Sequence, residues 1–122
     1  MNSQEKPLLN KPIWATDENH YLWGGVCHGW HLVRASGLQI IEEQMPPGSE
    51  EQRHLHRQAR QFFYVLEGEL TIEVEGQLTA MTAGQGLEIA PGQPHQVKNI
   101  SAKDVRFLVI SQPPSHGDRK LA

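Results

Sequence analysis

The sequence predicts an all-β fold, either a sandwich or a barrel, in a single domain. Three observations lead to this prediction. Glycine and proline interrupt the chain at short intervals, so the runs between them are too short for most helices. Several of these runs alternate apolar and polar residues with a period of two, as half-buried strands do. No segment shows a sustained helical period.

The first strands in chain order differ in how they are expected to be covered. The run 38–45 predicts a strand whose polar outer side carries Gln39, Glu42 and Gln44. The run 61–66 is nearly all apolar, so we expect neighbours on both of its faces. The sheet is therefore expected to have at least one inner strand and one strand with a polar side.

The later strands follow the same logic. The run 70–75 alternates strictly, which predicts a half-buried strand. Glu-Gly pairs at 67–68 and 75–76 flank this strand, and both resemble hairpin turns. The run 104–110 is largely apolar and predicts a further buried strand. No internal repeat or change of composition indicates a second domain.

Composition and charge exclude several classes of function. The chain has 122 residues and a net charge of −3, which argues against a nucleic-acid partner. No apolar run approaches the roughly 20 residues needed to span a bilayer. The first dozen residues are polar and lack the apolar stretch of a signal peptide, so we expect a cytoplasmic protein. The lone cysteine, Cys27, cannot form an internal disulfide and is expected to be a small buried residue.

The first candidates for chemistry are His54 and His56. Residues at i and i+2 of a strand point to the same face, so two imidazoles here can meet one metal ion. Alone, the pair is a weak signal, because solvated histidines on a strand are the commoner explanation. The distances in sequence from this pair to the glycines on either side are a stronger indication of a metal site.

Two glycine-bounded stretches contain these histidines and a third one, His95. They read Gly48-x5-His54-x-His56-x4-Gln61-x6-Gly68 and Gly84-x5-Ala90-Pro91-Gly92-x2-His95-x3-Asn99. The stretches resemble the two motifs of the cupin superfamily, G-x5-H-x-H-x(3,4)-E-x6-G and G-x5-P-x-G-x2-H-x3-N. All spacings agree. Two identities differ, since Gln61 replaces the family's glutamate and Ala90 its proline.

The resemblance implies an antiparallel jelly-roll barrel of roughly six to eight strands. We expect the barrel to cover residues 18–112, preceded by an arm or docking strand at 1–17 and followed by a tail at 113–122. The stretches 60–68 and 113–119 are similar to those of small single-domain cupins, a subgroup whose function is mostly unassigned.

Carried over to this chain, the family's metal ligands are His54, His56, Gln61 and His95. One divalent ion is expected, and imidazole-rich sites suit Fe, Zn, Ni or Cu, with Mn also allowed. Gln61 brings no negative charge and cannot act as a general base. Two interpretations of Gln61 stay open, a metal ligand and a pocket-lining residue that does not touch the metal.

Further residues are expected around the metal. Strand alternation directs Phe63 and Val65 inward with Gln61. His28, Trp30 and His31 could reach the barrel mouth, with Trp30 lining the pocket and His28 or His31 as candidate catalytic bases. The alternative for this stretch is a surface strand or a subunit contact.

Three functions compete on this fold. The favoured one is a metal-dependent oxygenase-type enzyme that acts on a small polar or anionic metabolite. A metal-dependent isomerase or lyase is the second, and a non-enzymatic cupin that binds or senses a small ligand is the third. Two of these functions are enzymatic and the third is not.

A homodimer is expected. Small cupins usually pair through a sheet edge or a swapped N-terminal strand, and the aromatic residues Trp14, Tyr21 and Trp23 follow the polar arm. The alternative is that these aromatic residues pack inside their own barrel.

Overall fold

The computed structural model describes residues 9–122, which form two β-sheets and one short 3-10 helix, η2 (Asp17–Asn19). The strands are β1 (His20–Trp23), β2 (Cys27–Arg34), β3 (Gln39–Met45), β4 (His54–His56), β5 (Arg60–Glu67), β6 (Glu69–Val74), β7 (Gln77–Thr82), β8 (Gly86–Ile89), β9 (His95–Lys98), β10 (Val105–Gln112) and β11 (Arg119–Leu121). Every pairing is antiparallel, so the predicted fold class is confirmed.

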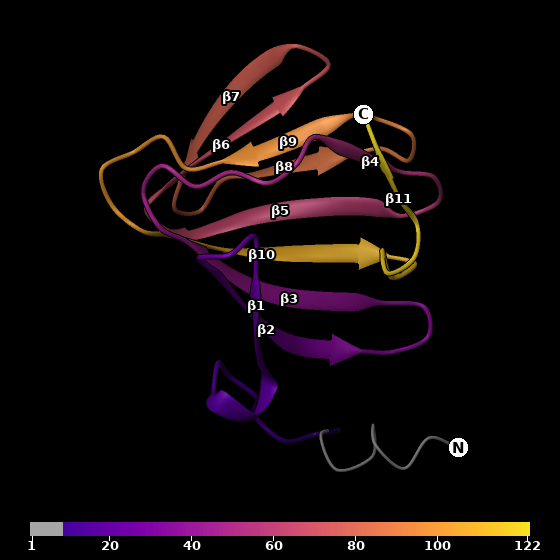
Figure 1. Ribbon diagram of the computed structural model, residues 1–122. Coiled ribbons are helices and arrows are strands. Elements are labelled where there is room, and N and C mark those ends of the chain that lie inside the picture. Colours follow the sequence, from indigo (N-terminus) through magenta and orange to yellow (C-terminus); the bar gives the residue numbers. More distant parts are fainter. Residues whose placement is uncertain (1–8) are drawn as a thin grey trace.

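The chain crosses repeatedly between the two sheets. One sheet has the order β1-β2-β3-β10-β5-β8, and the other has the order β11-β4-β9-β6-β7 (Figure 1). Strands distant in sequence are therefore neighbours, as where β10 lies between β3 and β5. Such crossings define the jelly-roll barrel. They also bring β4 and β9, which carry the candidate histidines, side by side.

Buried and exposed side chains alternate along β5, although its nearly apolar sequence predicts that both faces are covered. Gln61, Phe63 and Val65 are buried, whereas Phe62 and Tyr64 are 38% and 37% exposed. The expectation that this strand is covered on both faces is wrong for the single chain, because its outer face has no layer above it. β6 is more buried than the half-buried strand that its sequence predicts, since four of its six residues are buried.

The two Glu-Gly turns have different roles. Glu75 and Gly76 connect β6 to β7, which pair with each other, so the predicted hairpin is present. Both have positive φ angles, 50° and 89°, as tight hairpin turns require. Gly68 instead carries the chain from β5 into the other sheet, and the hairpin predicted there is wrong. A Cβ at Gly68 would lie 2.5 Å from the carbonyl oxygen of Asp104, so only glycine fits.

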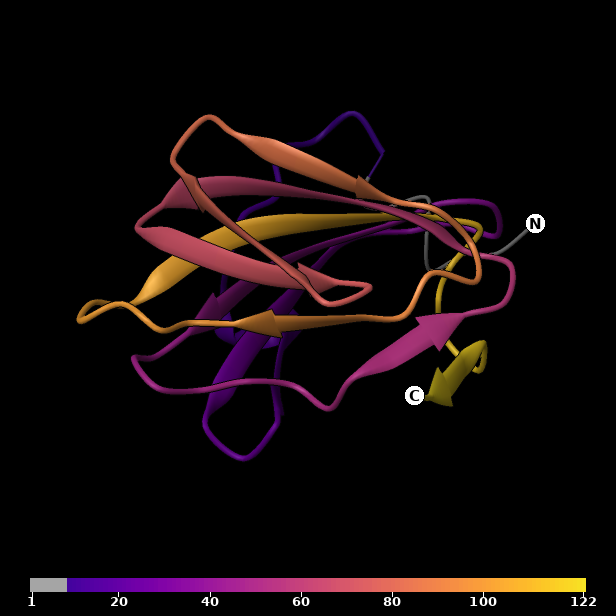
Figure 2. The ribbon, with the colours of Figure 1, turned by 90° about the horizontal axis from the view of Figure 1, so that it is seen from above.

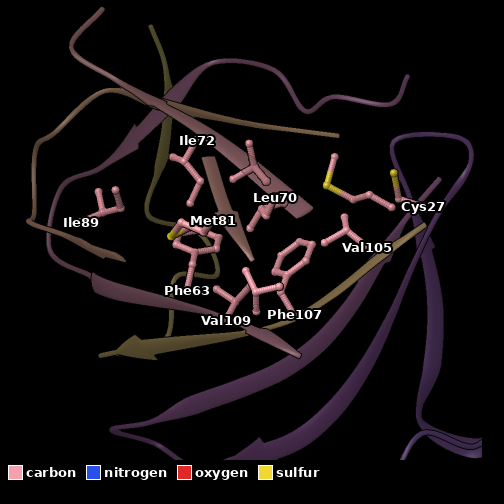
Figure 3. Close-up of a cluster of buried hydrophobic side chains, with 12 residues drawn as sticks. Cys27, Phe63, Leu70, Ile72, Met81, Ile89, Val105, Phe107 and Val109 are labelled. Carbon is pink, nitrogen blue, oxygen red and sulfur yellow. The ribbon is translucent and has the colours of Figure 1, made fainter. Parts of the chain in front are cut away.

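The apolar core fills one part of the barrel interior (Figure 3). Cys27 is buried in this cluster, as expected of a small apolar residue. Val65 and Phe107 are fully buried there, and Phe63 lies within 6.2 Å of Phe107, centroid to centroid. Phe63 also packs 6.1 Å from the ring of His95. It therefore forms the boundary between the core and the candidate site.

The two ends of the chain differ from simple arms. Residues 1–8 of the predicted arm lie outside the described residues, and residues 9–16 form no strand. The predicted tail, 113–122, is exposed but contains β11, which pairs with β4 (Figure 2). Its Asp118 accepts hydrogen bonds from the backbone N–H groups of three consecutive residues, 57–59. Within residues 9–122, no helix is long and apolar enough to cross a membrane.

Candidate metal centre and cavity

The three predicted histidines converge on one point inside the barrel. His54 on β4 lies directly opposite His95 on β9, and His56 faces the same side two residues later. Their exposed fractions are 4%, 0% and 6%, respectively. One nitrogen atom of each ring can be chosen so that all three lie within 4.8 Å of one another. The geometry allows these imidazoles to hold a single metal ion.

The backbone fixes the orientation of two of the rings. Nδ1–H of His54 donates to the carbonyl of Gln52 at 2.8 Å, and Nδ1–H of His95 donates to that of Gln93 at 3.0 Å. A neutral imidazole protonated at Nδ1 keeps a lone pair on Nε2. Metal-binding histidines use this arrangement, in which the other ring nitrogen is held by a backbone or carboxylate group.

The free nitrogen atoms fit a metal ion. Nε2 of His95 is buried and has no hydrogen-bond partner. Nε2 of His54 lies 3.2 Å from Nε2 of His56. Two ligands at about 2.0–2.1 Å from one ion would be this far apart at an angle of about 100°. A cation between the rings would thus satisfy Nε2 of His95, and it would replace the contact between Nε2 of His54 and Nε2 of His56.

The protonation of the rings also suits a metal. Burial, with a smaller contribution from His95, lowers the pKa of both His54 and His56 to about 4. Burial also lowers the pKa of His95. All three rings are therefore neutral at neutral pH, the form in which imidazole binds metals.

Gln61 lies beside the histidines, on β5. Its Nε2 donates to Oγ of Ser111 at 3.1 Å, whereas its Oε1 is buried without a hydrogen-bond partner. Gln61 lines the same cavity as His54 and His56. A free carbonyl oxygen at this place could complete a ligand set, so ligation by Gln61 stays a prediction.

A cavity of about 430 Å³ opens from the histidines toward β1, β2 and β3. Its size suits a small metabolite. Apolar, polar and C-terminal residues share its wall: Tyr21, Trp23, His31, Gln39, Ile41, Glu43, Glu51, His54, His56, Gln61, Phe63, Val109, Ser115, His116, Gly117 and Arg119.

The predicted residues around the metal are only partly brought together. Phe63 and His31 line the cavity, but Val65 lies farther along β5 in the apolar core. Trp30 and His28 lie on the opposite face of β2, because residues 28 and 30 alternate with 27, 29 and 31. Trp30 stacks with His28 there, 5.9 Å between centroids. The assignments of Trp30 to the pocket and of His28 to catalysis are therefore corrected by the structure.

Sequence reasoning missed several polar residues of the cavity, among them Tyr21, Glu43 and Glu51, and the C-terminal residues Ser115, His116 and Arg119. It also placed Gln39 on the outer side with Glu42, although residues three apart on a strand face opposite sides. Glu43 could have been found from the period of two, since it follows Ile41 on the inward face of β3. A glutamate in a polar-looking strand is nevertheless normally read as a surface residue.

Glu43 and Glu51 are unusual carboxyl groups. Burial raises the pKa of each to about 8, and the charge of Glu51 contributes to the shift of Glu43. Oε1 of Glu51 accepts the backbone N–H of Val97 at 3.1 Å. Oε2 of Glu43 accepts the hydroxyl of Tyr21 at 3.4 Å. The cavity thus joins a neutral histidine cluster to carboxyl groups that exchange protons near neutral pH.

The family of this chain follows from its match to a known sequence profile. The sequence profile of a family described as a cupin domain matches residues 41–111, which contain all three histidines and Gln61. The chain belongs to the cupin family. The matched residues run from β3 to β10 and include every predicted metal ligand of this cupin.

Similar proteins carry little functional information. An uncharacterized protein of Methanocaldococcus jannaschii is 29% identical over 92 residues, covering 75% of this chain and 74% of that protein. A Streptomyces cyaneus protein named polyketide synthase CurC is 30% identical over 69 residues, 57% of this chain but only 45% of its own length.

A solved structure confirms the fold. An uncharacterized conserved protein with a double-stranded β-helix domain from Klebsiella pneumoniae superposes with a TM-score of 0.77. It is 22% identical, and the match covers 93% of this chain and 98% of that one. At this identity the likeness shows the cupin barrel and nothing about the reaction.

Proposed function

We propose that this cupin binds one divalent transition-metal ion through His54, His56 and His95, with Oε1 of Gln61 as a fourth ligand, and acts on a small polar metabolite in the adjoining cavity. The observation that carries the proposal is the convergence of three buried, neutral imidazoles, with Nε2 of His95 lacking any hydrogen-bond partner. The metal, when bound, would polarise an oxygen atom of the substrate.

The ligand set favours particular metals. Three imidazoles and an amide are all neutral, so the ion would keep its full positive charge. Fe, Zn, Ni and Cu suit such a nitrogen-rich set, whereas Mn gains less from it than from carboxylates. Four protein ligands would leave two positions open on an octahedral ion, where a substrate could bind alone or together with O₂.

An oxygenase is the first reaction type we propose, because open positions on a histidine-rich ion suit O₂ chemistry. A metal-dependent isomerase or lyase is the second, and the Tyr21–Glu43 pair in the cavity favours it. A cupin that only binds its ligand would also use the open positions of the ion, but it would need no groups that transfer protons.

Metal content tests the proposal first. Protein purified without a histidine tag should contain a divalent metal near one equivalent by elemental analysis. Addition of Fe, Mn, Ni, Cu or Zn to metal-stripped protein should raise its melting temperature. Absence of both effects would remove the basis of the proposal.

Oxygen uptake then tests the reaction type. The Fe(II)-loaded protein should consume O₂ with a member of a panel of small diols and diketones if it is an oxygenase. Turnover of a substrate without O₂ uptake would favour the isomerase or lyase instead.

We also propose a homodimer, formed through the outer face of the six-stranded sheet. Phe62 and Tyr64 stack there, 6.3 Å between centroids, and Leu66 extends the apolar strip. Of the three aromatic residues expected at the contact, only Trp14 is exposed, since Tyr21 and Trp23 line the cavity. The dimer is therefore supported by β5 rather than by the N-terminal aromatic residues.

A further inference from the structure

One row across the six-stranded sheet joins Tyr21, Gly29 and Glu43. Tyr21 on β1 pairs with Gly29 on β2, and Gly29 pairs with Glu43 on β3. The tyrosine ring lies over Gly29, where a Cβ would be only 2.3 Å from Cζ of the ring. The missing side chain lets the hydroxyl of Tyr21 cross β2 and donate to Oε2 of Glu43 at 3.4 Å.

Glu43 lacks the partners of a structural carboxylate. Among residues 9–122 it forms no salt bridge, and its one side-chain hydrogen bond is the weak one from Tyr21. The ring of His31 stacks on Tyr21, 4.7 Å between centroids, and so holds the hydroxyl in place. A carboxyl group held by one donor at a cavity wall keeps lone pairs for a ligand.

A second observation points to a ligand in the same cavity. Nδ1 of His31 is buried and has no hydrogen-bond partner, and His31 lines the cavity with Glu43. Buried polar atoms without partners are rare in native proteins and mark places where a ligand, ion or water completes the bonding. This unpaired nitrogen atom and Glu43 thus border one space of about 430 Å³.

We propose that Glu43 is the proton-transfer residue of this cavity and acts on a small carbonyl compound that carries a hydrogen on the carbon next to its carbonyl group. Tyr21 is the positioning residue that holds the carboxyl. This inference rests on the proposed function, because the metal must polarise the carbonyl oxygen. It assigns to Glu43 the role that Gln61 cannot perform, since an amide is no base.

The step balances within the substrate and Glu43. The ionised carboxylate takes the proton from the α-carbon, the electron pair of the broken C–H bond forms a C=C bond, and the π pair of the carbonyl group moves to its oxygen. The protonated carboxyl can then return the proton to the same carbon. In a hydroxyketone it can instead protonate the former carbonyl carbon, provided that the proton of the α-hydroxyl group moves to the former carbonyl oxygen. Burial raises the pKa of Glu43 to about 8, so the acid and base forms both exist near neutral pH.

The charges around the cavity narrow the substrate class. Glu43 and Glu51 lie on its wall, and Arg119 is the one lysine or arginine among the residues that line it. Both carboxyl groups are mostly protonated at neutral pH, because burial raises the pKa of each to about 8, whereas the proposed ion and Arg119 are positively charged. The cavity therefore suits a hydroxyketone or a keto acid, with the negative charge of a keto acid balanced by the ion and Arg119.

Solvent exchange tests the inference without knowledge of the natural substrate. Zn-loaded protein under argon is incubated in D₂O with hydroxyacetone, dihydroxyacetone or pyruvate, and loss of the α-proton signals is followed by NMR. Zinc carries no redox chemistry, so oxygenation cannot obscure the result. We expect exchange above the protein-free rate with at least one probe.

The variant Glu43→Gln should lower this exchange by about 10²-fold or more while binding zinc with unchanged stoichiometry. Glu88→Gln is the matched control, because Glu88 lies exposed on β8 and pairs with Arg60 outside the cavity. Glu43→Asp keeps a carboxylate and should retain part of the exchange, which guards against a loss caused by misfolding.

The positioning role of Tyr21 has its own readout. Its hydroxyl lowers the pKa of Glu43 against the larger effect of burial, so Tyr21→Phe should shift the pH profile of exchange to higher pH. An unshifted profile would assign Tyr21 a structural role only.

The outcomes are distinguishable. A wild-type protein that binds no metal contradicts the proposed function itself. Metal-loaded wild-type protein that exchanges none of the probes overturns this inference and leaves the metal centre intact. An exchange rate of metal-loaded Glu43→Gln that lies within about threefold of the wild-type rate also overturns this inference, because the base must then be another group.

Discussion

His54 and His95 face each other across β4 and β9, with their rings 4.6 Å apart between centroids. This is the single residue pair that joins the two strands in register. A metal ion held by both rings would reinforce the connection between two strands that are paired in register at only this one residue pair. Metal binding should therefore contribute to stability as well as to chemistry.

Replacing His95 by alanine should abolish most metal binding, because one of three converging imidazoles is lost. We expect metal affinity to fall at least about 100-fold. Mutation of a residue that only orients a metal ligand can already lower affinity by this factor, and His95 is itself a proposed ligand. The gain in unfolding free energy at saturating metal, about 2.7 kcal/mol at 100 times Kd, should disappear as well. Elemental analysis and calorimetry measure the two effects.

His116→Ala is the control for this experiment. His116 lines the cavity but does not belong to the cluster that converges on one point. Unchanged occupancy in His95→Ala, or an equal loss in both variants, would contradict the assigned metal centre.

Replacing Gln61 by glutamate should strengthen the binding of hard cations such as Mn²⁺. A carboxylate brings negative charge to a site of neutral ligands, and we expect a gain of roughly tenfold, or about 1.4 kcal/mol. Titration calorimetry with Mn²⁺ measures the change. Gln39→Glu, on the same cavity wall, controls for added charge at a distance. Equal affinities in Gln61→Glu and wild type would favour the interpretation of Gln61 as a wall residue.

Stability should fall between pH 4.5 and pH 8 because of Glu43. Burial raises the pKa of its carboxyl from 4.5 to about 8, so the folded state keeps a proton that the unfolded chain releases in this range. The stabilising difference is complete below pH 4.5 and is lost as the pH rises toward 8. Glu43→Gln lacks this titration and should gain stability relative to wild type from pH 5 to pH 9.

Urea denaturation of metal-free protein at several pH values checks this. The histidines titrate in both proteins, so the difference between the two curves reports Glu43 together with its electrostatic coupling to Glu51. Parallel curves over the whole range would show that Glu43 titrates normally in the folded protein.

The homodimer should depend on the outer face of β5. Tyr64→Glu places a charge in the proposed contact and should shift the mass measured by light scattering toward that of one chain, 13.8 kDa. Leu78→Glu is a matched control, since Leu78 is exposed on β7 of the other sheet. A wild-type protein of single-chain mass would reject the dimer.

The parts of the site that sequence could reveal are those fixed by local spacing. His54 and His56 share a face because of strand alternation. His95 follows Gly92 with two residues between them, which is the spacing of the second cupin motif. The parts that it could not reveal depend on register between strands. Nothing local places Tyr21 opposite Gly29, or tells whether 28 or 31 of β2 faces the cavity. The pairing of β11 with β4 is likewise a long-range contact between exposed residues.

The approach of Tyr21 to Gly29 makes the two positions interdependent in evolution. With tyrosine at 21, alanine at 29 collides with the ring and displaces it from Glu43. The three atoms nearest to such a Cβ all belong to Tyr21, so a small residue at 21 removes this collision. Since Gly29 has no positive φ, alanine is then expected to stabilise the strand by about 0.4–1 kcal/mol. The same substitution is harmful or beneficial according to its neighbour, which is sign epistasis. A lineage could fill position 29 only after giving up the tyrosine.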